Sequence, residues 1–283
     1  KVLEKEFGSF LLNAPNKDSG CRQDACRLRL IKERGRKMNA VETYYSNVTQ
    51  IMSQVFEQER DAMEQAAEKL AQANKEKHSV FAFGCNHAGL ITLELFYRTG
   101  GMVTVNPVRA PGMMLEVAPI TMSSEMERIP DYGRVLFDSL PAKAGDVIMI
   151  HSVSGRNAVT VDMAQAAREK GLTVIVITNM NTATAVSSRH PSGKKLHDFA
   201  DILIDNHGDY GDASVQLEGF AQKVAATSTV VGAAILNAVI ARACELLWEQ
   251  GIQPPVFMSG NVDGVDGYNK AVIAEHAENI FYM

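Results

Sequence analysis

A polar stretch of six residues, SVSGRN at 152–157, has the composition best suited to holding an anion. It follows the apolar run DVIMI at 146–150, which is typical of a buried strand, and it lies before residues 160–171 (TVDMAQAAREKG), which are typical of a helix. Where a strand of a parallel sheet leads into a helix, the helix presents unpaired N–H groups and the positive end of its dipole. The position therefore favours a negatively charged ligand.

The side chains of this stretch supply what a phosphate group needs. They offer two hydroxyls, close backbone access, a positive charge and an amide, from Ser152, Ser154, Gly155, Arg156 and Asn157. An ordinary helix cap explains one such polar residue, but not this number within six positions. The nucleotide-binding pattern GxxxxGK[ST] is absent, and serine stands at 152 where a GxSxG hydrolase motif needs glycine. The stretch therefore predicts a phosphate-binding loop.

Five apolar stretches separated by helix-like segments must position this loop. They are residues 79–84, 102–106, 146–151, 172–179 and 200–206. Continuous apolar strands that alternate with helices indicate a parallel sheet covered on both faces. Residues 40–73 predict an amphipathic helix, and residues 227–251 predict a helix buried nearly all round in a helical last third. We expect an α/β fold, a three-layer α/β/α sandwich with a mostly parallel five-stranded sheet, flanked by N- and C-terminal helices.

The overall composition narrows the class of protein. The chain has 283 residues, of which 46% are hydrophobic and 22% charged, as is typical of a globular protein with an adequate core. Its formal net charge of -5 argues against a nucleic-acid partner, which needs a basic surface. The sequence has no apolar run near the roughly 18 residues of a membrane span and no secretory signal, so we expect no membrane contact and a cytoplasmic location.

Cysteine and histidine spacing gives no sign of a metal or a disulfide framework. The 4 cysteines form no CxxC pair, and the 7 histidines form no HExxH motif. We therefore expect no metal and no cofactor.

The first 37 residues differ from the rest, because they show no sustained period and end in a basic cluster just before Met38. Two interpretations stay open. In one, Met38 is the native start and residues 1–37 are translated upstream DNA, since purine codons alone can encode KERGRK, as in a ribosome-binding site. In the other, they are a genuine flexible arm. We expect an irregular extension at 1–37 and the functional domain at 38–283.

The loop and further motifs resemble the SIS (sugar isomerase) domain family, whose members bind or isomerise phosphosugars. SVSGRN is similar to the family's S-x-S-G-x-[TN] phosphate loop. Motifs similar to a bacterial subfamily of phosphoheptose isomerase-like proteins run from about Met38 to the end: FYRTGG (96–101), VNPVRAPGMML (105–115), SSRHPSGKKL (187–196), ADILIDN (200–206), TSTVVGAAILNA (227–238) and PPVFMSGNVDGVDGYN (254–269). The resemblance implies a sugar phosphate ligand, a homodimer or homotetramer with sites near the subunit contact, and a sugar-facing position for Thr227 and Ser228.

Two positions depart from the family pattern. The family's first strand ends in G-x-G-x-S, whereas residues 84–88 of this chain are GCNHA. On this resemblance Asn86 and His87 take the sugar-contacting positions. The family's catalytic glutamate corresponds to Arg98 here, and Glu94 lies one turn earlier in the expected helix, about 6 Å back along its axis.

Conversion of an aldose to a ketose needs a base for the proton beside the carbonyl and an acid for the oxygen. We select Glu94, Glu116 and His190 as catalytic candidates and also consider Glu127 and His87. His190 belongs to SSRHPSGKK, a loop that gathers hydroxyls and positive charges after the fourth strand. A solvated helix face explains each glutamate equally simply, a helix cap explains His87, and a basic surface loop explains His190.

Three functions compete on this evidence. The favoured one is a sugar-phosphate isomerase of the phosphoheptose type. The alternatives are an amino-sugar phosphate lyase or etherase and a non-catalytic phosphosugar sensor. Such a sensor usually carries a DNA-binding domain, and the residues before Met38 have no helix-turn-helix pattern, which favours an enzyme.

Overall fold

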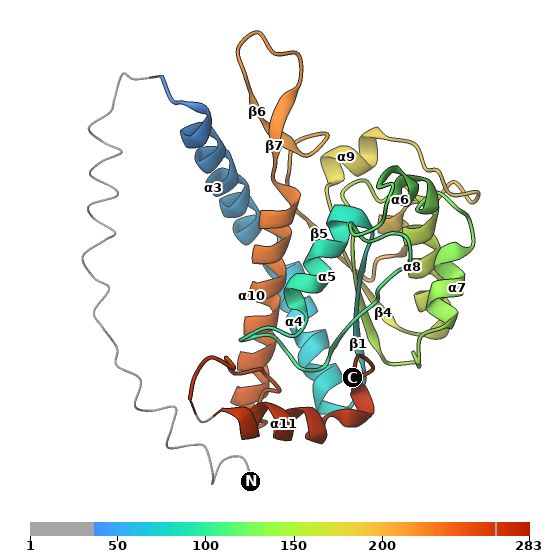
Figure 1. Ribbon diagram of the computed structural model, residues 1–283, viewed down its shortest axis with the longest axis vertical. Helices are drawn as coiled ribbons and strands as arrows, with labels where there is room; N and C mark the ends of the chain where they lie inside the picture. Colours follow the sequence, from blue (N-terminus) through green and yellow to red (C-terminus); the bar gives the residue numbers. More distant parts are fainter. Residues whose placement is uncertain (1–36, 264) are drawn as a thin grey trace.

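The computed structural model describes residues 37–263 and 265–283. Residues 1–36 lie outside this range, so the structure does not test whether residues 1–37 are native. The described residues form a central sheet with helices on both sides, a projecting arm and a C-terminal helix (Figure 1).

The central sheet has five parallel strands, as the sequence predicts, and their order in the sheet is β2-β1-β3-β4-β5. Their bounds are β1 Val80–Gly84, β2 Val105–Pro107, β3 Val147–His151, β4 Thr173–Thr178 and β5 Ile202–Asp205. Gly84 pairs with His151, and His151 pairs with Ile177, so neighbouring strands end level with one another. The loops that follow them therefore meet at one edge. The strand order switches side between β1 and β3, because β2 lies on one side of β1 and the later strands lie on the other. Open parallel sheets bind ligands at such a switch point.

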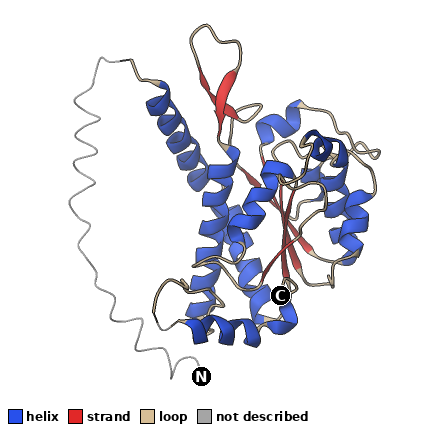
Figure 2. Cartoon of the chain, viewed as in Figure 1, coloured by secondary structure: helices blue, strands red, loops and turns tan. Residues whose placement is uncertain are grey.

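Helices cover the two faces of the sheet (Figure 2), and alternate strand residues pack against one layer or the other. Val80 and Ala82 face α4 (Arg60–Lys75), α5 (Gly89–Leu95) and α10 (Ser228–Glu249). Phe81 and Phe83 face α7 (Tyr132–Asp138) and α8 (Ala158–Lys170). A strand presents successive side chains to opposite faces, so a continuously apolar strand must be covered on both. The expected three-layer α/β/α sandwich is confirmed.

The helix expected over residues 40–73 is in fact two helices, α3 (Ala40–Gln58) and α4, which meet at Glu59. The carboxylate of Glu59 accepts hydrogen bonds from the Asp205 backbone N–H at 3.3 Å and from His207 Nε2 at 2.8 Å. These contacts fix the junction against the end of β5. The break depends on groups far away in the sequence, so helical periodicity did not reveal it.

A projecting arm was missed by the prediction of a helical last third. It consists of α3 and a two-stranded antiparallel hairpin, β6 (Ala213–Gln216) and β7 (Lys223–Ala226), which lie side by side beyond the sheet (Figure 1). The Tyr44 hydroxyl donates to Ala226 O at 2.9 Å, and Asn47 Nδ2 donates to Ser214 O at 2.8 Å. Strands of four residues are too short for a clear alternating pattern.

The long helix α10 differs from its prediction in two ways. It packs against α4 and α5 on one side, but Val230 and Trp248 on its other side are 41% and 61% exposed, so it is not buried all round. By length and composition it could also cross a membrane, although the sequence reading found no such run, and 44% of its most apolar window is buried in this fold. Helices in the core of a folded domain can have the same length and apolar composition.

The remaining short elements connect these layers. They are α6 (Thr121–Met126), α9 (Met180–Ala185), α11 (Asp266–Glu275) and four-residue or shorter 3₁₀ turns at Asn86–Ala88, Leu196–Phe199 and Ala277–Asn279. The turn at Asn86–Ala88 and the end of α6 lie over the carboxyl end of the sheet, beside the predicted phosphate loop.

Candidate functional site

The predicted phosphate loop leaves β3 and enters α8 through a glycine in the left-handed region. Gly155 has φ +57°, and a side chain on it would bring a Cβ to 3.0 Å from Leu196 Cβ. Its carbonyl accepts from Leu196 N at 2.8 Å, and Thr178 Oγ1 donates to Ser152 O at 2.6 Å. The loop is therefore held by β4 and by the turn at Leu196, and only glycine fits the bend without strain.

The loop presents a concentration of unused hydrogen-bond donors. Within the described residues, four backbone N–H groups around Gly155 have no acceptor, those of Ser154, Arg156, Asn157 and Ala158, and the N–H of Val153 earlier in the loop has none either. The Ser154 hydroxyl has no partner in the same range, whereas Ser152 Oγ accepts from Gly155 N at 3.2 Å. Successive N–H groups around a left-handed residue form a concave anion-binding nest, and the N-terminus of α8 adds the positive end of its dipole.

The side-chain amide of Asn157 is already engaged. Its Nδ2 donates to Glu127 Oε2 at 3.0 Å, and its Oδ1 accepts from Arg189 Nη1 at 3.0 Å. Glu127 also accepts from Asn86 Nδ2 at 2.8 Å. Of the groups of Asn157 that could donate to a phosphate, only the backbone N–H is free in this structure. Its side chain instead joins the β1 and β3 loops through the Glu127 carboxylate.

Two guanidinium groups lie at the rim of the loop. Arg156 Nη2 donates to Ser187 Oγ at 3.3 Å, and Arg189 is bound to Asn157. Over residues 37–263 and 265–283 neither forms an ion pair with a carboxylate, and the buried Arg156 Nε has no partner. Desolvation, followed by the charges of Arg156 and Arg128, lowers the pKa of Arg189. Neutral groups therefore orient the positive charge at the rim, and no carboxylate of the described residues forms an ion pair with it.

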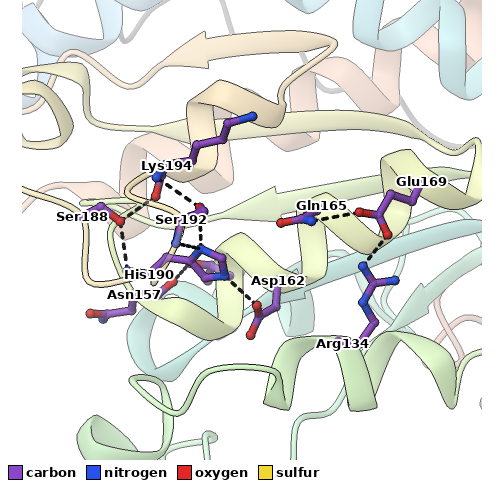
Figure 3. Close-up of polar contacts among 10 residues, drawn as sticks. Arg134, Asn157, Asp162, Gln165, Glu169, Ser188, His190, Ser192 and Lys194 are labelled. Atoms are coloured by element: carbon purple, nitrogen blue, oxygen red, sulfur yellow. Dashed lines mark hydrogen bonds and ion pairs between the residues drawn. The ribbon is translucent and has the colours of Figure 1, made fainter.

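His190 packs against α8 through Asp162 and joins the loop after α9 to that helix (Figure 3). Its Nε2 is 2.8 Å from Asp162 Oδ1, and its Nδ1 is 2.6 Å from Ser192 Oγ. Both ring nitrogens therefore have partners within the protein. This geometry supports a role in fixing the loop, and the catalytic role that the sequence suggested stays a prediction.

The two glutamates selected from the sequence do not contact the loop. Glu94, on α5, pairs with Arg98 and accepts from Asn237 Nδ2 on α10 at 3.2 Å. Helix α5 ends at Leu95, so Arg98 lies beyond it instead of within the expected helix. Glu116 is exposed in the segment between β2 and α6, without a polar contact among the described residues.

The four residues expected to contact the sugar lie at two places on the same edge. Asn86 and His87 follow β1, where Asn86 binds Glu127 and His87 is exposed. Thr227 and Ser228 are buried at the start of α10, where Asp212 accepts from both backbone N–H groups and from the Ser228 hydroxyl at 2.6 Å. The Asp212 carboxylate therefore caps the start of α10 and occupies these N–H and hydroxyl groups in this structure.

His151 is a buried polar residue at this edge that the sequence reading did not select. It ends β3, its Nδ1 lies 3.3 Å from Ala88 O, and its Nε2 is buried without a partner. Burial lowers its pKa to about 4, against smaller opposing effects of the Ala88 carbonyl and Asp212. The ring is therefore neutral at physiological pH. Its position at a strand end, directly before the predicted phosphate loop, was the available signal.

No group of three or more histidine, cysteine, aspartate or glutamate side chains arranged to hold a metal occurs in the part of the chain that the structure describes. The loop chemistry is that of an anion site, because its free groups are donors.

Comparisons with known proteins agree with this fold. A SIS domain model matches residues 43–179. The UPF0309 protein of Shouchella clausii (strain KSM-K16) is 45% identical over 246 residues, which cover 87% of this chain and 100% of that protein. The UPF0309 protein of Oceanobacillus iheyensis is 41% identical, with the same coverage of 87% and 100%.

Solved structures with a similar fold include a phosphoheptose isomerase from Francisella tularensis, with 14% identity, a TM-score of 0.49, and coverage of 72% of this chain and 96% of that one. Another is phosphoheptose isomerase from Neisseria gonorrhoeae, with 17% identity, a TM-score of 0.47, and coverage of 77% and 99%. Because it is 45% and 41% identical to relatives that it covers completely, the chain belongs to the UPF0309 family, and its residues 43–179 match the SIS domain model.

Proposed function

We propose that the protein binds a sugar phosphate at residues 152–158 and interconverts its aldose and ketose forms. The observation that carries the proposal is the cluster of four unpaired backbone N–H groups around Gly155, together with the free Ser154 hydroxyl. A phosphate monoester has three acceptor oxygens and a charge near −2 at neutral pH, so it matches a donor-rich nest better than a neutral sugar does. Arg156 and Arg189 add positive charge at the rim.

The sugar itself would extend from the phosphate toward the β1 loop. The switch point between β1 and β3 lies there, and open parallel sheets bind ligands at such points. Asn86 and His87 are placed at that side, so their polar groups are the ones proposed to meet sugar hydroxyls. The SIS domain match supports a phosphosugar ligand on grounds independent of this geometry.

Ser154→Ala tests the binding proposal. Removing one charge-assisted hydrogen bond of about 1.5 to 3 kcal/mol lowers affinity roughly ten- to a hundred-fold. A thermal-shift screen over five- to seven-carbon sugar phosphates identifies a ligand, since binding to the folded state alone raises stability. Ser53→Ala is the matched control, because Ser53 lies exposed on α3 and its hydroxyl donates to Thr49 O at 2.9 Å. Equal affinity of wild type and Ser154→Ala for every ligand found excludes the assignment.

Turnover separates the isomerase from its alternatives. A sugar-phosphate isomerase changes the position of the carbonyl, a lyase or etherase releases a second product, and a sensor binds without either change. Proton NMR of each bound sugar phosphate after incubation distinguishes these outcomes directly.

The proposed assembly is a homodimer or homotetramer, and the proposed location is cytoplasmic. Exposed apolar side chains support self-association, with Val41 78% exposed and Tyr45 61% exposed on α3, and Trp248 61% exposed on α10. Light scattering during size-exclusion chromatography tests the assembly, and a monomeric mass at micromolar concentration excludes it.

A further inference from the structure

The carboxylate of Glu127 bridges the β1 and β3 loops. Asn86, directly after β1, donates to one of its oxygens at 2.8 Å, and Asn157, at the start of α8, donates to the other at 3.0 Å. The Glu127 backbone carbonyl also accepts from Val159 N at 3.2 Å. Main chain and side chain are therefore both fixed against the loop proposed to hold phosphate.

This position places the carboxylate beside the proposed phosphate site without occupying its donors. Asn157 contributes its side-chain amide to Glu127 and leaves its backbone N–H free for an anion. A ligand held on that N–H and extending toward Asn86 must pass the Glu127 carboxylate. The carboxylate therefore lies along the path that the sugar chain takes from the phosphate toward the β1 loop, where the carbonyl end of the sugar would be.

The other acidic candidates lack this placement. Glu94 is committed to Arg98 and Asn237, and Glu116 is exposed with no contact to either loop in the described residues. The sequence lacks the expected glutamate at position 98, and the segment between β2 and α7 brings in a carboxylate from a different part of the chain.

Neutral amides suit a group that must stay reactive. They hold each oxygen in place, yet each carboxylate oxygen keeps lone-pair capacity for a further contact. An ion pair with arginine would occupy more of the lone pairs of the two carboxylate oxygens. Arg128, the adjacent residue, pairs with Glu125 at 3.2 Å instead.

Resting on the proposed function, we propose that Glu127 is the catalytic base of the aldose–ketose conversion. In the open-chain aldose, its carboxylate takes the proton from C2. The C2–H electron pair forms the C1=C2 bond, and the C1=O pair moves to O1, giving an enediol after O1 gains a proton. The carboxylic acid then returns its proton to C1 as O2 loses one and the carbonyl forms at C2. Protons and electrons balance without an added oxidant or reductant.

Glu127→Gln tests this role, with Glu125→Gln as the matched control. Glu125 lies two residues away and its side chain is 74% exposed. The probes are aldose phosphates of five, six and seven carbons in deuterium oxide, with deuterium incorporation at the carbon beside the carbonyl followed by NMR and affinity followed by calorimetry. Loss of a positioned base lowers the exchange rate by at least about a hundred-fold. Affinity is kept or increased, because a negative charge beside the phosphate is removed.

Further variants separate chemistry from structure. Glu127→Asp keeps the charge and withdraws it by one methylene, so it should exchange faster than Glu127→Gln and slower than wild type. Glu125→Gln should match wild type. A variant that affected only folding would lower its melting temperature and its affinity together, which contradicts the proposal.

The outcomes distinguish a failure of this proposal from a failure of the proposed function on which it rests. If wild type binds no sugar phosphate, the proposed function fails. If wild type binds and exchanges while Glu127→Gln exchanges at the same rate, binding stands and Glu127 is not the base. Binding by wild type with no exchange on any of these sugars also overturns the assignment of Glu127.

Discussion

Acidification should destabilise the protein through His151, whose ring is buried at the end of β3. Burial lowers the pKa of His151 from 6.5 to about 4 in the folded protein. Above pH 6.5 the ring is neutral in both the folded and the unfolded chain. Between pH 6.5 and pH 4 only the unfolded chain binds the proton, so the free energy of unfolding decreases as pH falls through this window.

The magnitude follows from the size of the pKa difference. About 2.5 pH units at 1.36 kcal/mol per unit gives about 3 kcal/mol over the whole window, and roughly 2 kcal/mol is already lost between pH 7 and pH 4.5. The group is fully buried, with 3% relative exposure for the residue, so solvent screening does not reduce this figure appreciably. The opposing charge of Asp212 is already included in the shift to about 4.

Urea unfolding of wild type and His151→Gln at pH 7 and pH 4.5 measures the effect. Titrating carboxylates common to both proteins cancel in the difference between their free energies of unfolding. We expect the advantage of wild type over the variant to shrink by roughly 2 kcal/mol at the lower pH. A difference that stays constant across the window would refute the argument that His151 is held neutral by burial.

Two further substitutions test the loop and its support. Gly155→Ala forces a side chain into the left-handed region at a position where Leu196 Cβ lies 3.0 Å away, so it should cost at least about 1 to 2 kcal/mol of stability and weaken phosphate binding. Gly193→Ala, at φ +73° with no neighbouring atom within 4 Å, is the control and should cost less in urea unfolding; an equal loss contradicts the close contact. His190→Gln weakens the contact with buried Asp162 and should cost about 1 to 3 kcal/mol while leaving phosphosugar affinity unchanged in calorimetry. A folded, stable His190→Gln protein with turnover reduced a hundred-fold would instead establish the catalytic role that its sequence context suggested.

The strands and the bend after β3 were predictable because their signals are local, whereas phosphate binding at that bend stays a prediction. Residues 147–150 and 174–177 are continuously apolar, as strands buried on both faces must be, and Gly155 marks a bend that the sequence places directly before a helix. Strand β2 was less clear: it lies at 105–107 instead of 102–106, because Met102 forms an isolated bridge with Val256 and Val103 packs with the C-terminal segment.

The arrangement of acidic groups was not predictable from spacing. Glu127 was one of several glutamates in the sequence, and only folding of the segment after β2 brings it between Asn86 and Asn157. The same holds for Asp212, which caps α10 from a residue 16 positions earlier. Pairings of this kind join segments distant in the chain, so neither helical nor strand periodicity carries information about them.

The central claim is that the bend after β3 holds the phosphate group of a sugar, and amide chemical shifts test it most directly. Isotopically labelled protein is titrated with the sugar phosphate that gives the largest thermal shift. We expect the largest amide changes at Ser154, Arg156, Asn157 and Ala158, whose N–H groups are free in this structure, with no change at Gly219 in the distant hairpin turn. Saturable binding that leaves those four amides unchanged would contradict the account.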